Sequence, residues 1–471
     1  MLPPYWDSIT GVFREAFWLI DNRWNYYDFA MVESGYKFGG ARTYYFSFYP
    51  SLISFLYLIF DPSYVFLLLR GLNLLALIGI IIGISRVAKA DNLPTGALII
   101  IAIFALSFPI FLSQLLALNM ELLLALAAVQ ALSSYHRNRL VPCFLWLLLG
   151  VLSKGSGALA AVAILLYDLS RFVFLGRKDI SRVFLLSIPT LVYAGFSLLE
   201  GKIFYQGGGD GQFRLGLIRT NWKELFSVIK FFSTSLDLIF FILIFIVVGL
   251  TIVFSLKKAA QAPHHFINLS LIYISVWIVC CLFYSPSLPR YLACCIFPLS
   301  YIAIFAARYL KFAALNALIF VVAAFNISNH SGNFYQSLNL GPFSNDGMYY
   351  DSSLNYVDAI RRDITSSEFI SSISSGPITI GWPLSIVLSD ARYGYVRSPL
   401  TNLVDYGKSR ADIPKSYVDS GYYFAQNNIW SPVVGRCTEP DELKQTVVNG
   451  LNPYFLCKIY LGDNLFLSRA F

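Results

Sequence analysis

The chain contains 471 residues, of which 57% are apolar and 13% are charged, and its formal net charge is +8. Soluble domains carry about 25% charged residues, so a mean hydropathy of +0.62 excludes a water-soluble globule, because too little polar surface remains to cover it. The excess of basic residues predicts lysines and arginines at the cytoplasmic ends of membrane helices rather than a nucleic-acid partner.

Residues 1–63 are rich in aromatic side chains and contain no run of about 20 apolar residues, the length that a membrane-spanning helix needs. The apolar stretch Ser47–Phe60 is too short to span a bilayer and predicts an interfacial or re-entrant helix. Among the acids of this segment, Asp7 follows the stiff sequence Pro3-Pro4-Tyr5-Trp6. Such a segment can hold a carboxylate at the membrane interface.

From residue 64 to residue 327, apolar runs follow one another closely and predict a transmembrane domain of about ten helices. The break Ser153-Lys154-Gly155 between two runs predicts the tip of a helical hairpin. The runs are 64–84, 95–116, 118–134, 140–153, 155–170, 183–200, 234–256, 266–285, 291–310 and 312–327.

The orientation of these helices follows from the distribution of lysine and arginine, which are enriched in short cytoplasmic loops. One set of short connections carries twelve such residues and the opposite set carries seven. The first set is therefore expected to be cytoplasmic, which places residues 1–63 and the tail outside. The twelve are Arg86, Lys89, Arg137, Arg139, Arg171, Arg177, Lys178, Arg182, Lys257, Lys258, Arg308 and Lys311.

The tail, residues 328–471, has 24 charged residues among its 144 and no run long enough to span. It predicts an extracytoplasmic α/β domain, in which Cys437 and Cys457 leave room for one disulfide. Thr438 and Asp441 form a capping box for a helix that ends at Gly450. The other expected elements are a helix at Asn355–Ile370, strands at Ile378–Trp382 and Gly394–Val396, and a hairpin at Leu456–Leu467.

Four ionisable residues lie at the outer ends of the apolar runs: Arg70, Glu121, Lys154 and Arg290. Each costs about 2.5–3.5 kcal/mol at a helix centre, so such groups usually face an interior cavity and serve function. Taken singly, each can instead extend to the membrane interface. Three cations gathered on one face would repel one another unless an anion, such as a lipid phosphate, lies between them.

The order of these signals resembles that of the GT-C fold glycosyltransferases, which use sugars linked to polyprenyl phosphate, especially bacterial relatives of protein O-mannosyltransferases and lipid A aminoarabinose transferases. The aromatic-Asp-Glu motif of the family is matched by Tyr5-Trp6-Asp7. Its Pro-rich segment start is matched by Phe48-Tyr49-Pro50-Ser51-Leu52, and its Arg-Leu-rich second span at Arg70.

Further along, the acid before a helix is matched by Glu121, the Thr-Lys-Gly-Pro-like motif by Ser153-Lys154-Gly155-Ser156, and the late motif by Pro289-Arg290-Tyr291-Leu292. The similarity covers about residues 3–310. The chain departs from the family in having Asp7-Ser8 where an Asp-Glu pair is usual. Family members also carry a span before the acidic loop, and we expect such a helix to be encoded upstream of Met1.

The resemblance implies an integral, multi-pass protein of the bacterial cytoplasmic membrane that transfers a sugar, with inversion, from a polyprenyl-phosphate donor. The acceptor would be a hydroxyl or amine of a lipid, glycan or protein at the outer face. Asp7 would be the general base, Glu121 would orient the acceptor, pair with a cation or act as a second acid, and Lys154, Arg290 and Arg70 would bind the donor phosphate. A divalent metal stays open as a cofactor, although no cluster of acids and histidines favours one, and the sequence identifies no other cofactor.

Other functions remain compatible with the sequence. A transporter or flippase for lipid-linked saccharides would have two pseudo-symmetric halves with broken helices. A polysaccharide polymerase or ligase is also many-spanned with a large outer loop. A scaffold without activity would account for the missing second acid of the Asp-Glu pair.

Overall fold

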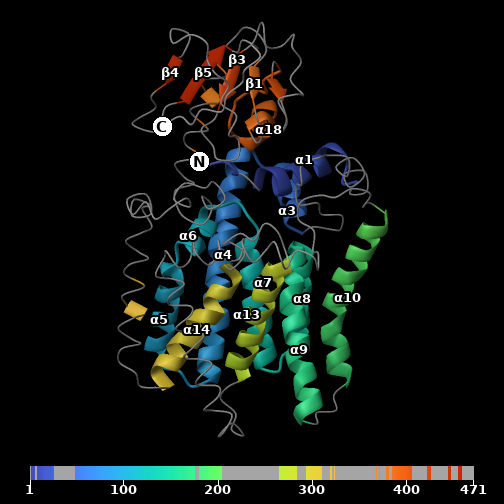
Figure 1. Ribbon diagram of the computed structural model, residues 1–471, viewed down its shortest axis with the longest axis vertical. Helices are drawn as coiled ribbons and strands as arrows, with labels where there is room; N and C mark the ends of the chain where they lie inside the picture. The colour runs from blue at the N-terminus through green and yellow to red at the C-terminus, as the bar shows by residue number, and fades with distance from the viewer. Residues whose placement is uncertain are drawn as a thin grey trace.

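The computed structural model describes residues 2–5, 8–25, 48–175, 180–203, 265–283, 293–309, 378–380, 384–401, 403–405, 422–425, 444–446 and 454–458, with single positions at 319–320, 323, 360, 364, 367–368 and 371. These residues form a bundle of antiparallel helices with a small sheet beyond one end (Figure 1). We call the end nearer the sheet, where helix α7 (Glu121–His136) begins, the proximal end, and the opposite end the distal end.

The helices of the bundle follow the apolar runs that the sequence predicted, except for run 234–256 and most of run 312–327, which lie outside the described residues. Run 95–116 forms two helices, because Phe108 is extended before Pro109, a residue that disfavours helical geometry at its predecessor. The helices are α4 (Pro62–Ala90), α5 (Thr95–Ser107), α6 (Pro109–Leu116), α7 (Glu121–His136), α8 (Leu140–Ser153), α9 (Ala158–Leu175), α10 (Ile180–Ile203), α13 (His265–Phe283) and α14 (Ala293–Tyr309).

Helix α7 lies at the centre of the bundle and packs against α4, α8, α13 and α14. Nearly every residue from Glu121 to Tyr135 is buried, as expected for a helix that is apolar all round. Two of its polar side chains bond to carbonyls of α4: Gln130 to Gly79 at 2.5 Å and Ser133 to Gly83 at 3.0 Å. Glycines four residues apart allow this close approach of two helices.

The outward faces of the bundle carry large apolar side chains. In the part of the chain that the structure describes, two helical stretches, Pro62–Ala90 and Gly155–Phe172, are long and apolar enough to cross a membrane. Shorter apolar helices accompany them. The exposed apolar residues include Leu67, Leu74, Leu75 and Ile78 of α4, Ile99 and Ile103 of α5, Val141 and Leu145 of α8, and Phe184 and Leu191 of α10.

Three short helices at the proximal end come from the amino-terminal segment: the π-helix η1 (Ser8–Phe13), α1 (Arg14–Asp21) and α3 (Phe48–Tyr57) (Figure 1). The helix expected within Ser47–Phe60 is confirmed as α3. Edge-to-face aromatic contacts join these elements, since Phe17 packs against both Tyr57 and Tyr393 at centroid distances of 4.9 and 4.8 Å.

The carboxyl-terminal segment forms a five-stranded mixed sheet in the order β2-β1-β3-β5-β4. Strand β1 pairs in parallel with β2 and β3, whereas β5 pairs antiparallel with β3 and β4. The strands are β1 (Ile378–Ile380), β2 (Leu403–Asp405), β3 (Tyr422–Ala425), β4 (Lys444–Thr446) and β5 (Tyr454–Lys458), with helix α18 (Leu384–Ser389) and the 3₁₀ turn η6 (Ala391–Tyr393) between β1 and β2.

Two expectations for this segment are wrong. Strand β4 lies where a helix ending at Gly450 was expected, because its pairing with β5, from Lys444 opposite Leu456 onward, overrides the local capping signal. Residues 394–396 bend instead of forming a strand, since Gly394 adopts a φ of 81° that turns the chain after η6. The strand at 378–380 agrees with the prediction, and most of the predicted helix, Cys437 and residues after 458 lie outside the described part.

The turn after α18 attaches the sheet segment to the amino-terminal segment. Arg392 binds both carboxylate oxygens of Asp21, at 2.7 and 2.8 Å, and stacks over Phe17 at 4.4 Å. Burial alone would lower the pKa of this guanidinium, whereas its bonds to Asp21 and Asp390 raise that pKa above the ordinary value. Tyr395 donates to the Pro4 carbonyl at 2.8 Å. Arg392 and Tyr395 therefore attach Asp21 of α1 and Pro4 to the sheet segment.

Replacing Arg392 with alanine is expected to loosen α1 while leaving the bundle intact. The pair is partly exposed, so the loss is about 1 kcal/mol, which corresponds to about fivefold faster opening. Hydrogen–deuterium exchange of the α1 amides measures it. Arg397, which is exposed on the same segment, provides the control substitution Arg397→Ala. Equal exchange in both variants would contradict the role assigned to Arg392.

Candidate active site

Glu121 and Lys154 form an ion pair at the proximal end of the bundle. Glu121 Oε1 accepts a hydrogen bond from Lys154 Nζ at 2.7 Å, and the side chains are 4% and 26% exposed. The pair forms because α7 and α8 are consecutive antiparallel helices, so the end of α8 returns to the start of α7. Glu121 also occupies the first turn of α7, where the helix dipole favours a negative charge. The resemblance implied three alternative roles for Glu121, and pairing with a cation, one of them, is seen in the structure.

Lys154 is the tip of the predicted helical hairpin, which is confirmed. It lies in extended conformation between α8 and the 3₁₀ turn η2 (Gly155–Gly157). Its N–H donates to Gly150 at 3.1 Å, and its carbonyl accepts from Gly157 at 2.8 Å. A lysine ammonium has three N–H donors, of which the bond to Glu121 uses one. The backbone of Lys154 is therefore fixed on both sides while its charge remains partly exposed.

Tyr49 of α3 is near enough to Glu121 and Arg70 for the charge of each to act on its hydroxyl. Its side chain is fully buried, and its hydroxyl forms no hydrogen bond with any residue that the structure describes. Burial raises the pKa of Tyr49, the nearby charge of Glu121 raises it further, and Arg70 acts in the opposite direction. The phenol therefore stays protonated and presents a neutral O–H donor beside charged groups.

Arg70 connects α4 to the segments on either side of the site. Its Nη2 donates to Leu2 at 2.5 Å, its Nε to Leu116 at 3.2 Å, and its Nη1 to Phe66 at 3.3 Å, all three at backbone carbonyls. These contacts were not predicted from the sequence, and the binding of phosphate by Arg70 stays a prediction. They give Arg70 a positioning role, because they attach Leu2 and the end of α6 at Leu116 to helix α4.

A second bond joins the amino-terminal segment to the approach to α7. Ser8 donates to Asn119 Oδ1 at 2.7 Å, and both residues are buried. Asn119 stands two residues before Glu121. Asp7 and Arg290, the other predicted site residues, lie outside the described residues. The structure thus brings Glu121 and Lys154 into contact, and Tyr49 lies within electrostatic reach of both Glu121 and Arg70.

Sequence reasoning missed Tyr49, Ser8 and Asn119. Tyr49 belongs to an aromatic-rich segment in which interfacial tyrosines are common. Ser8 was noted only as the residue that replaces the second acid of the family motif. In that position its hydroxyl bonds to an amide 111 residues away, a pairing that no local pattern signals.

Among the described residues, no group of three or more His, Cys, Asp or Glu side chains is arranged to hold a metal ion. Comparison with known proteins gave no matching family model, no significantly similar curated protein and no significantly similar solved structure.

Proposed function

We propose that the chain is a multi-pass membrane glycosyltransferase that moves a sugar from a polyprenyl-phosphate donor to an acceptor hydroxyl or amine at the outer face, with inversion. The observation that carries the proposal is the ion pair of Glu121 and Lys154, placed at the end of the bundle to which the amino-terminal segment is bonded through Arg70 and Ser8.

The membrane assignment covers about ten spans within residues 64–327, with residues 1–63 and an α/β domain at 328–471 outside. Large apolar side chains on the outward faces of α4, α5, α8 and α10 support it, because a soluble protein rarely exposes so many. The asymmetry of charge agrees with it as well. Arg86 and Lys89 end α4, Arg137 and Arg139 join α7 to α8, and all lie at the distal end, which is then cytoplasmic.

The chemistry assigns each proximal residue a task. As the bond between the anomeric carbon and the phosphate oxygen breaks, its electron pair stays on the phosphate, so the site must stabilise a growing negative charge. Lys154, together with Arg290, supplies that positive charge. Glu121 holds the ammonium in place, and Tyr49 offers a neutral hydrogen bond. The acceptor oxygen forms the new bond to carbon while its proton passes to the Asp7 carboxylate.

Transfer of radiolabel from polyprenyl-phosphate sugars to envelope acceptors, measured in membranes that contain the chain, tests this function. We expect Asp7→Asn to lower the rate by about 10²- to 10⁴-fold without changing the amount of inserted protein, because the amide cannot take the proton. Asp28→Asn is the matched control, since Asp28 is a second acid of the same segment.

A wild-type rate in Asp7→Asn would remove Asp7 from the mechanism. Label that crosses the bilayer while still attached to the lipid would identify a transporter. Label that neither crosses nor reaches an acceptor would contradict the proposed function.

A further inference from the structure

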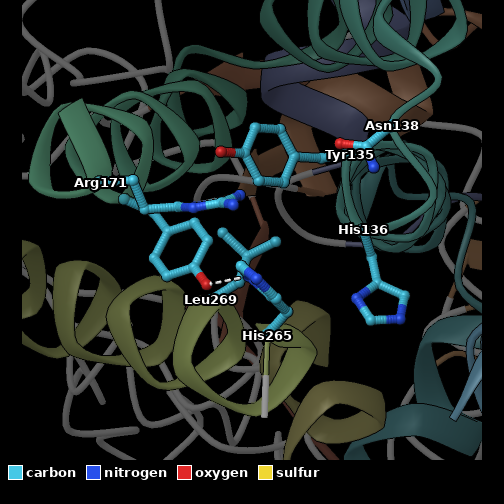
Figure 2. A pocket seen from close by; sticks show the side chains of 7 residues that line it. Tyr135, His136, Asn138, Arg171, His265 and Leu269 are labelled. Carbon is cyan, nitrogen blue, oxygen red and sulfur yellow. Dashed lines mark hydrogen bonds between the residues drawn. The ribbon is translucent and has the colours of Figure 1, made fainter. Parts of the chain in front are cut away.

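A second polar site lies at the distal end of the bundle, far along α7 from Glu121. It is a cavity of about 70 Å³ between α7, α9 and α13. Figure 2 shows the guanidinium of Arg171 reaching from α9 between Tyr135 and Leu269. The residues that line the cavity are Tyr135, His136, Asn138, Tyr167, Arg171, His265 and Leu269.

Arg171 is a buried cation without a carboxylate partner among the described residues. Its side chain is buried, and its Nε forms no hydrogen bond there. Its guanidinium lies over the ring of Tyr167, 5.8 Å from the ring centre. Burying a charged group is costly unless it is paired and hydrogen-bonded. A bound anion would therefore stabilise this guanidinium, and the described residues around it do not provide one.

Two carboxylates at this end of the bundle, Asp168 and Asp91, are already engaged by other groups. Asp168 accepts from Arg182 Nε at 2.9 Å and from the Tyr135 hydroxyl. Asp91 accepts from His136 Nε2 at 3.0 Å and from the Tyr301 hydroxyl. Each acid thus has its own cationic or neutral donors, and no acid in the described part of the chain is paired with Arg171.

His136 contributes a second unused polar atom. Its Nε2 contacts Asp91, while its buried Nδ1 forms no hydrogen bond with any described residue. When the imidazole is protonated beside Asp91, both ring nitrogens are donors, so Nδ1 can donate to a bound anion. Close to the cavity, burial lowers the pKa of Arg137, and the charges of Arg139 and Arg86 lower it further, as expected where positive charges accumulate.

We propose that this cavity binds a phosphate group, held by the guanidinium of Arg171 with His136 as a second donor. Arginine matches phosphate oxygens through two parallel hydrogen bonds. A cavity of about 70 Å³ has room for a small tetrahedral anion. Such basic sites between helices bind lipid head groups at the cytoplasmic side. The phosphate is either the head group of a lipid or a free ion.

The test uses the full-length chain purified in neutral detergent, and it does not rest on the proposed transfer reaction. One arm measures the unfolding temperature against inorganic phosphate, with sodium chloride at matched ionic strength. The other measures it in nanodiscs that contain phosphatidic acid or only phosphatidylcholine. A rise in the unfolding temperature with inorganic phosphate identifies a free anion as the ligand. A rise in the unfolding temperature with phosphatidic acid alone identifies a lipid head group.

In the stabilising arm, Arg171→Gln is expected to weaken apparent affinity by about tenfold or more, because a charge-assisted, two-pronged contact is lost. The control is Arg139→Gln, at an exposed residue of the same end. Its apparent affinity should stay within about twofold of that of the wild type. If Arg171→Gln does not fold, Arg171→Lys is the second variant. It keeps the positive charge but cannot form a bidentate contact, so it too should bind phosphate more weakly than the wild type.

Two results would overturn the proposal. One is the absence of stabilisation of the wild-type chain by phosphate or phosphatidic acid beyond that of chloride or phosphatidylcholine. The other is equal stabilisation of the wild-type chain and the folded Arg171 variants.

Discussion

Replacing Lys154 with methionine is expected to lower the rate of sugar transfer by about 10²- to 10³-fold, the usual effect of removing one preorganised donor from a site that stabilises developing charge. Methionine keeps the length of the side chain and removes its charge. The rate measured over a range of donor concentrations would show the loss. Lys89→Met, at an exposed lysine of the distal end, should leave the rate unchanged.

The same substitution also leaves Glu121 buried without its partner, so a second effect must be separated from the first. Breaking a fully buried ion pair by removing one member costs about 3–5 kcal/mol. The cost expected here is smaller, because the Lys154 side chain is partly exposed. The double variant Lys154→Met with Glu121→Gln removes both charges. It should regain most of the unfolding temperature and none of the lost rate.

Recovery of transfer in the double variant would show that Lys154 acts only by neutralising Glu121. A wild-type rate in Lys154→Met alone would remove the lysine from the mechanism. Loss of the rate with regained stability is the expected outcome, because a phosphate leaving group needs a positive charge at the site whatever the state of the acid.

The sequence predicts those parts of the molecule that depend on local composition. Apolar runs indicated the helices, and the charged break at Lys154 indicated the hairpin. Glu121 stood out because an ionisable group at the start of an apolar run is rarely accidental. These features need no knowledge of which helix lies beside which.

The remaining features depend on contacts between distant segments. The strand β4 forms because β5 pairs with it, although its own sequence favours a helix cap. Arg70 stood out in the sequence because it lies in an apolar run, but its backbone partners could not be predicted; its binding of phosphate stays a prediction. In the structure, three of its donors satisfy carbonyls of residues 2, 66 and 116, two of which are remote in sequence. A single sequence cannot show which carbonyl groups of distant segments will lie beside the Arg70 side chain.

Replacing Gly157 with alanine is expected to displace Lys154 by altering the hairpin that carries it. A methyl group at Gly157 would overlap the carbonyl group of Gly150 and approach the backbone nitrogen of Val151 within 2.8 Å. These are backbone atoms of α8, which cannot move aside as a flexible side chain would. Overpacking typically costs about 1–3 kcal/mol, and the contact with backbone places this variant at the upper end.

A fall in unfolding temperature in detergent, with a matching fall in transfer, would be the signature of this change. Gly195→Ala serves as the control, because a methyl group there meets nothing within 4 Å and alanine favours the helix. If Gly157→Ala unfolded at the temperature of that control, α8 and η2 could not approach as closely as they do here. The hydrogen bonds that fix the backbone of Lys154 would then not explain how its ammonium reaches Glu121.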